Sequence, residues 1–99
     1  MAYKVKVTAS AENDLDAIIS YIVQELSNSQ AAGYLPDEIT KMYHMLTVNP
    51  MVFPVCSQPL LQRYRKVTVM RYVIIYRIDD GTVYVERFFS QLEDYVNKL

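Results

Sequence analysis

The chain has 99 residues, 52% hydrophobic and 21% charged, so it has the length of a single domain (residues 1–99) and a composition that excludes a disordered protein. Residues 1–10 lack the apolar core of a secretion signal, and no run approaches the roughly 18 apolar residues of a membrane span, which predicts a soluble, cytoplasmic protein. The net charge is −1 but unevenly placed: three lysines oppose six acids up to Leu60, whereas seven cations oppose five acids from Leu61 onward.

The first two predicted elements are a strand and a helix. Residues 3–8 alternate apolar and polar side chains, which is typical of a half-buried strand. Ser10 is then placed to cap a helix over residues 11–26. Its apolar residues recur at helical spacing and form one stripe: Leu15, Ile18, Ile19, Ile22, Val23 and Leu26.

A second helix is predicted over residues 30–48. Its apolar residues also share one face: Leu35, Ile39, Met42, Tyr43 and Leu46. Pro36 interrupts the pattern and leaves two alternatives, because it either kinks one continuous helix or restarts a shorter one with Asp37 and Glu38 in its first turn. Two consecutive amphipathic helices with a short link predict an antiparallel helical hairpin.

Three strands are predicted after the loop that begins at Asn49 and Pro50. They cover residues 64–70, 72–78 and 82–89, and Asp79-Asp80-Gly81 between the last two is a hairpin signal. From Ser90, a Ser-x-x-Glu capping box opens a short C-terminal helix. The order is therefore strand, helix, helix, three strands and helix, with the helices expected on one face of the sheet.

Five of the seven cations after Leu60 are arginines, and Arg65, Arg77 and Arg87 fall on the predicted strands. In the strand 72–78, alternation assigns Ile74 and Tyr76 to the helix-covered face and Val73, Ile75 and Arg77 to the open face. In the last strand it places Val83, Val85, Arg87 and Phe89 on one face, unless a one-residue bulge swaps the faces. We expect an open apolar surface surrounded by four arginines: Arg65, Arg71, Arg77 and Arg87.

These four arginines can be interpreted in two ways. The planar guanidinium group pairs well with carboxylates and phosphates, so the surface could bind an acidic amphipathic peptide or another anionic partner. Alternatively, the arginines solubilise the sheet edges and pair with acids of the same chain, namely Asp79, Glu86 or Glu93.

Two residues that often carry chemistry occur once each. Cys56 excludes an intrachain disulfide and a cysteine metal cluster, and with no acid or histidine beside it in sequence it is interpreted as a packing residue. His44 lies within a helical pattern and is interpreted as a surface or core-edge residue. No metal or cofactor is expected.

Three segments together resemble the RelE/ParE superfamily of toxins from bacterial type II toxin-antitoxin systems, also known as plasmid stabilization proteins. AENDLDAIISYIVQEL is similar to the family's first helix, and QAAGYLPDEITKMYHMLTVNPMVFP to its second helix and the following turn. RKVTVMRYVIIYRIDDGTVYVERFFSQLEDYVNKL is similar to its closing strands and C-terminal segment. Each motif is weak alone, but their common order and spacing cover nearly the whole chain.

The resemblance implies an α+β fold: a curved antiparallel sheet of about four strands, an N-terminal helical hairpin on one face and a short C-terminal helix. It also implies a cognate acidic antitoxin that forms a hetero-oligomer with the toxin. Two activities follow from it. RelE-like members are metal-free endoribonucleases that cleave mRNA on the ribosome, whereas ParE-like members inhibit growth by poisoning DNA gyrase.

The resemblance also bears on individual residues. Val73 stands where ribonuclease members keep a catalytic arginine, and residues 90–92 stand where they carry a basic or histidine cluster. The candidates that remain for catalysis are Arg65, Arg71 and Tyr95. Since arginine and tyrosine are poor bases near neutral pH, a ParE-like binder is favoured over an enzyme. The alternatives are a RelE-like ribonuclease or an inactive or adaptor member of the same fold.

Overall fold

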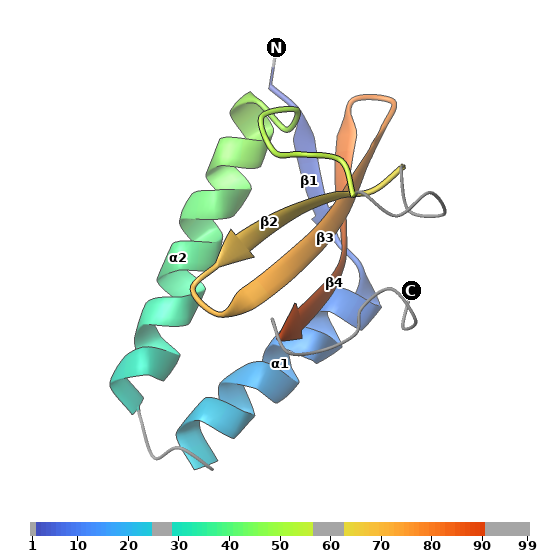
Figure 1. Ribbon diagram of the computed structural model, residues 1–99. Helices are drawn as coiled ribbons and strands as arrows, with labels where there is room; N and C mark the ends of the chain where they lie inside the picture. The colour runs from blue at the N-terminus through green and yellow to red at the C-terminus, as the bar shows by residue number, and fades with distance from the viewer. Residues whose placement is uncertain (1, 25–28, 57–62, 91–99) are drawn as a thin grey trace.

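Two helices cover one face of a four-stranded sheet in the computed structural model, which describes residues 2–24, 29–56 and 63–90 (Figure 1). This arrangement confirms the α+β class and the helical hairpin. The predicted C-terminal helix lies outside the described residues. The described elements are β1 (Lys4–Val7), α1 (Ala9–Gln24), α2 (Ser29–Val48), β2 (Arg65–Val69), β3 (Tyr72–Asp79) and β4 (Thr82–Ser90).

The strands lie in the order β1-β4-β3-β2, and the sheet is mixed. β2 pairs with β3 and β3 with β4 in antiparallel fashion, as expected. β1 instead runs parallel to β4, with Lys4 opposite Thr82 and Val7 opposite Val85, so the expectation of a wholly antiparallel sheet is corrected for this pair. The long connection through the helical hairpin supplies the crossover that a parallel pair needs.

Thr8, and not Ser10, caps α1. The Thr8 hydroxyl accepts a hydrogen bond from the Ala11 amide at 3.1 Å, and the Thr8 carbonyl accepts the first helical bond from the Glu12 amide at 3.0 Å. The same hydroxyl donates to the Glu86 carbonyl at 3.0 Å, so the cap also joins α1 to β4. This second bond involves a residue far away in the chain, which is why local patterning favoured Ser10.

α2 is one continuous helix through Pro36, which resolves the two alternatives left by the sequence. Proline has no amide hydrogen, so one helical hydrogen bond is missing there. The Thr40 hydroxyl donates to the Pro36 carbonyl at 2.9 Å within the following turn. Packing of the apolar face on the sheet offsets the missing bond, because Leu35 and Ile39 on either side of Pro36 are buried.

The core lies between the helices and the sheet. The α2 stripe is confirmed by the burial of Leu35, Ile39, Met42 and Leu46, with Tyr43 half-buried beside them. In α1, Ile22 is buried and the rest of the described stripe packs against the core, except that Val23 is 44% exposed; Leu26 lies outside the described residues. The sheet contributes the other half of this core: Val67, Ile74, Tyr76, Val83, Val85 and Phe88.

A bulge in β4 exchanges its faces. The pairing runs Ile75 with Arg87 and then Tyr76 with Val85, so Glu86 is an extra residue on β4. Val85 therefore points to the helices, whereas Arg87 points to the other face. The prediction that Val83, Val85, Arg87 and Phe89 share one face is therefore wrong, because the extra residue shifts the alternation of β4 by one position. Beyond the bulge, Asp80 (φ 50°) and Gly81 (φ 76°) form the predicted hairpin turn, in which both central residues have positive φ.

Candidate docking surface

The sheet face away from the helices carries a second, smaller apolar cluster. Val73, Ile75 and Phe89 pack with Cys56 there, all four are buried, and Tyr64 lies against them. Burial raises the pKa of the Cys56 thiol, an effect that the nearby Lys66 partly opposes, so the thiol is protonated at neutral pH. The apolar centre predicted for this face is present, but it is buried and offers little surface to a partner.

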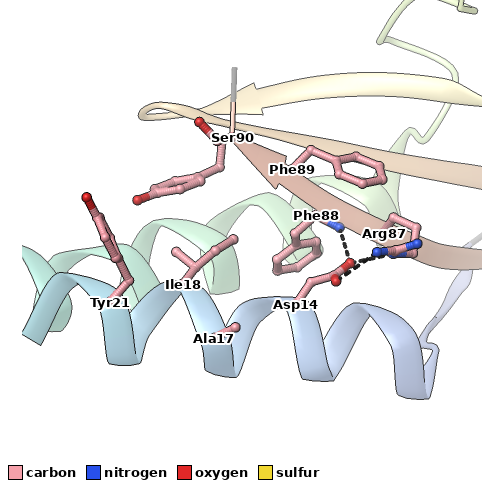
Figure 2. A pocket seen from close by; sticks show the side chains of 9 residues that line it. Asp14, Ala17, Ile18, Tyr21, Arg87, Phe88, Phe89 and Ser90 are labelled. Atoms are coloured by element: carbon pink, nitrogen blue, oxygen red, sulfur yellow. Dashed lines mark hydrogen bonds and ion pairs between the residues drawn. The ribbon is translucent and has the colours of Figure 1, made fainter. Parts of the chain in front are cut away.

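Arg87 is held by Asp14 of α1 (Figure 2). The Asp14 carboxylate accepts hydrogen bonds from Arg87 Nε at 2.6 Å and Nη2 at 3.1 Å, and a third from the Phe88 amide at 3.0 Å. Both side chains are largely buried, with 18% of Asp14 and 30% of Arg87 exposed. Because the carboxylate accepts hydrogen bonds from two guanidinium nitrogens and a backbone amide, it forms a fixed structural contact between α1 and β4.

Arg77 is likewise engaged within the chain. Its Nε lies 2.6 Å from Oε1 of Glu86, the bulge residue, and its Nη1 lies 3.4 Å from Oδ2 of Asp79. The guanidinium also stacks 4.2 Å from the centre of the Tyr84 ring. The hydrogen bond to Glu86 raises the pKa of Arg77 further above its ordinary value. Two of the three acids proposed as internal partners for the arginines, Asp79 and Glu86, therefore do pair with one.

Arg65 fastens the loop after α2 to the sheet. Its Nη1 donates to the Phe53 carbonyl at 2.6 Å and to the Met51 carbonyl at 3.3 Å. Nearby, the buried Tyr76 hydroxyl donates to the Pro50 carbonyl at 2.5 Å, and burial raises the pKa of Tyr76 to about 12. Arg65 thus satisfies backbone carbonyls that would otherwise lack a donor at the start of this loop.

Arg71 differs from the other three arginines. It lies in the two-residue turn between β2 and β3, directly after Met70, and its side chain is exposed. Among residues 2–24, 29–56 and 63–90, no hydrogen bond or ion pair engages its guanidinium. Arg71 also lowers the pKa of the adjacent Tyr72, although burial of that phenol outweighs it and the net shift is upward. Arg71 is therefore the predicted site residue best placed to meet an external anion.

A pocket of about 320 Å³ lies between α1 and the end of β4 (Figure 2). Ala17, Ile18 and Phe88 supply its apolar lining, and Tyr21 and Ser90 bring hydroxyl groups to it. Tyr72 also lines it. Phenol and hydroxyl groups beside apolar side chains give the pocket a mixed lining, which suits the binding of a group with both polar and apolar parts.

The four predicted arginines do not form one rim. Arg65 and Arg77 lie near one end of the β2–β3 hairpin, Arg71 lies in the turn at the other end, and Arg87 reaches toward α1. Tyr95 lies outside the described residues. Asp14 was not predicted as a partner of Arg87; its one signal in the sequence is its position next to Leu15, at the border between the polar and apolar faces of α1.

Within residues 2–24, 29–56 and 63–90, no group of three histidine, cysteine, aspartate or glutamate side chains could hold a metal ion. No described helix is long and apolar enough to cross a membrane.

Comparison with known proteins places these features in context. Residues 5–95 match the family model of the ParE toxin of the type II toxin-antitoxin system parDE. No curated protein matches the chain in sequence.

The fold is shared with solved structures, among them the following three. One is the chromosomal ParDE system of P. aeruginosa, with a TM-score of 0.73 and 20% identity over 90% of this chain and 96% of that one. Another is the RelBE2 toxin-antitoxin complex of Mycobacterium tuberculosis, with a TM-score of 0.61 and 22% identity over 91% and 99%. The third is YafQ of E. coli, with a TM-score of 0.60 and 14% identity over 90% and 93%.

Proposed function

Because the chain belongs to the ParE toxin family of type II toxin-antitoxin systems, we propose that it arrests growth in the cytoplasm by binding an essential target such as DNA gyrase, and that a cognate acidic antitoxin neutralises it in a toxin-antitoxin hetero-oligomer. The fold is shared with structures of both ParDE and RelBE2, so the choice of target has to rest on the residues of this chain.

The observation that carries the proposal is that three of the four predicted arginines already bind groups of the same chain. Metal-free cleavage of RNA needs a base at the 2′-hydroxyl and cations on the phosphate. Arg77 and Arg87 are already bonded to carboxylates, and Arg65 to carbonyl groups. His44 is exposed on α2 and is not part of the sheet. These contacts favour a protein that acts by binding over one that acts on a phosphodiester.

The target is tested with two purified systems. Addition of the protein to DNA gyrase should inhibit supercoiling, with the extent of inhibition rising with toxin concentration. In a translation extract the protein should leave mRNA intact. Cleavage of mRNA at codon-defined positions, together with normal gyrase activity, would contradict the proposal and establish the RelE-like alternative, in which Arg65, Arg71 and Tyr95 are the catalytic candidates.

The antitoxin part of the proposal is tested through Arg71. Arg71→Glu should weaken binding of the cognate antitoxin by about tenfold or more, because an exposed cation that attracts an acidic partner becomes a repelling anion. Its urea unfolding should match that of the wild type, since no described residue bonds to Arg71. Lys4→Glu, an equal charge change on the opposite edge strand, serves as the control and should bind normally. Equal affinities for the wild type and Arg71→Glu would refute a docking role for Arg71.

A further inference from the structure

Exposed apolar side chains gather where α2 ends and the following turn begins. Val48, Met51 and Val52 are 66%, 57% and 58% exposed, and all three lie within residues 48–52 of the chain. Exposed apolar residues that are scattered singly need no explanation, but neighbouring ones mark a site of interaction. These three residues, the apolar turn, are therefore a candidate contact surface.

The backbone of the apolar turn is held in place by hydrogen bonds. The Met51 amide donates to Oδ1 of Asn49 at 3.3 Å, and the Val52 amide donates to the Asn49 carbonyl at 3.4 Å. From the sheet, Arg65 donates to the Met51 carbonyl at 3.3 Å, and the intervening Pro50 is buried. Because the turn is already fixed, little conformational entropy is lost when a partner binds to its side chains.

A hollow of about 600 Å³ lies beside the apolar turn. Val48 and Asn49 line it from the end of α2, Ala2 and Tyr3 from the segment before β1, and Gly81 from the turn between β3 and β4. Figure 1 shows these three segments together at one end of the molecule. The surface therefore offers a partner both apolar side chains to bury and a space to fill.

The charges near the apolar turn favour a partner that carries a carboxylate. Arg65 bonds to the Met51 carbonyl, and within residues 2–24, 29–56 and 63–90 no acid forms an ion pair with its guanidinium. At the hollow, the Lys4 amide donates to the Gly81 carbonyl at 3.2 Å and Asp80 precedes Gly81, so these two exposed charges offset each other. The apolar turn thus lies beside one uncompensated cation.

Three other occupants are disfavoured by the same features. Nucleic acid binds through cations and would leave the apolar side chains unburied. A second copy of this chain, packed about a twofold axis, would bring its own Arg65 toward that of the first. The antitoxin is expected at Arg71, which lies at the other end of the β2–β3 hairpin from Arg65. The target of the toxin is the partner that remains.

We propose that the apolar turn is the surface with which the protein binds its target, DNA gyrase, and that Met51 and Val52 pack on an apolar patch of gyrase with a carboxylate at its border that meets Arg65. The inference rests on the proposed function, since it assigns a surface to the target named there. A few central side chains carry most of the energy of such a contact, so single substitutions should have large effects.

Met51→Asp and Val52→Asp test this surface. Each should raise the toxin concentration that half-inhibits supercoiling by about tenfold or more, because a charge replaces an apolar side chain at the contact. Met51→Leu keeps an apolar side chain and should inhibit like the wild type. Met70→Asp is the matched control, since it makes the same change at a similarly exposed methionine in the β2–β3 turn, and it should also inhibit normally.

Two further measurements show whether the effect is local. Met51→Asp and Val52→Asp should match the wild type in urea midpoint, because exposed side chains contribute little to folding, and in affinity for the cognate antitoxin. A photoreactive benzophenone side chain at position 52 should cross-link the wild-type sequence to a gyrase subunit, whereas the same group at position 70 should not.

The outcomes separate the inference from the function on which it rests. If the wild type and both aspartate variants inhibit gyrase equally, the apolar turn is not the contact surface, although the toxin function stands. If the wild type does not inhibit gyrase, both are refuted. A large loss of stability in the variants would show that the chain itself covers the turn. Loss of antitoxin affinity alone, or conversion of a toxin dimer to a monomer, would identify the antitoxin or a second copy as the occupant and overturn the proposal.

Discussion

Removal of the Asp14 carboxylate should destabilise the protein strongly, although Asp14 lies on a surface helix. Asp14→Ala deletes the acceptor of three hydrogen bonds, two from Arg87 and one from the Phe88 amide. The guanidinium, which is only 30% exposed, would then lack its carboxylate partner, and the amide its acceptor. The substitution therefore releases the contact between α1 and the bulged part of β4.

The magnitude follows from the burial of the pair. Breaking a fully buried ion pair by removing one partner costs about 3–5 kcal/mol, whereas an exposed pair is worth less than about 1 kcal/mol. With 18% of Asp14 and 30% of Arg87 exposed, we expect a loss of about 2–3 kcal/mol in the free energy of unfolding. That is a large part of the roughly 5–15 kcal/mol that stabilises a domain of this size.

The assay is urea unfolding of Asp14→Ala beside Asp16→Ala. Asp16 is exposed on the same helix, so its substitution carries the same change in helix propensity and charge without the three bonds. Asp16→Ala should stay within about 0.5 kcal/mol of the wild type. A double-mutant cycle with Arg87→Met should give a coupling energy above about 1 kcal/mol. Equal effects of the two alanine substitutions, or independent effects of Asp14 and Arg87, would refute the reasoning.

Three further predictions concern single residues. Burial raises the pKa of Tyr76 from 10.0 to about 12, so between these pH values the folded protein keeps a proton that the unfolded chain releases. The free energy of unfolding should therefore decrease as the pH rises above 10, and at pH 12 the decrease should reach about 2 kcal/mol. Tyr76→Phe should remove this part of the pH dependence in urea titrations. At neutral pH the substitution should cost about 1 kcal/mol, because the hydrogen bond to the Pro50 carbonyl is lost. If the free energy of unfolding of Tyr76→Phe decreased above pH 10 as steeply as that of the wild type, the effect would not come from Tyr76. Pro36→Ala should raise the free energy of unfolding by roughly 1–3 kcal/mol because α2 gains a hydrogen bond, and a loss of stability would show that Pro36 packs favourably. Gly81→Ala should lower the free energy of unfolding by about 1 kcal/mol, because alanine is strained at the positive φ of this residue. No atom lies within 4 Å of an added Cβ, so a steric clash should not contribute. An unchanged melting temperature would be inconsistent with that strain.

The local elements of this fold could be predicted from the sequence because each follows a periodicity of its own. The apolar stripe of α2 and the alternation in β3 locate the core, and Asp80-Gly81 locates a turn. Contacts that join distant segments could not be predicted in this way. The Thr8 cap also bonds to Glu86, and the parallel pairing of β1 with β4 depends on the path of the whole chain.

The candidate site was less predictable than the fold for the same reason. Alternation located the arginines on the strands, but it carries no information about which acids they meet. The bulge at Glu86 reverses β4 locally, turning Arg87 away from the helix-facing core and bringing Glu86 to Arg77. Asp14 meets Arg87 only through tertiary packing of α1. Arg71 is exposed because it lies in a turn, where none of the described strands and helices supplies an acid that bonds to it.

The pairing of β1 with β4 has a consequence for when the toxin can first act. Thr8 and its partner Glu86 are 78 positions apart, so a nascent chain cannot close its sheet until almost all of it has left the ribosome. Fragments from interrupted translation lack the strand that lies between β1 and β3 in the sheet. We therefore expect them to be degraded without harming the cell, so that toxicity begins only with chains synthesised past β4.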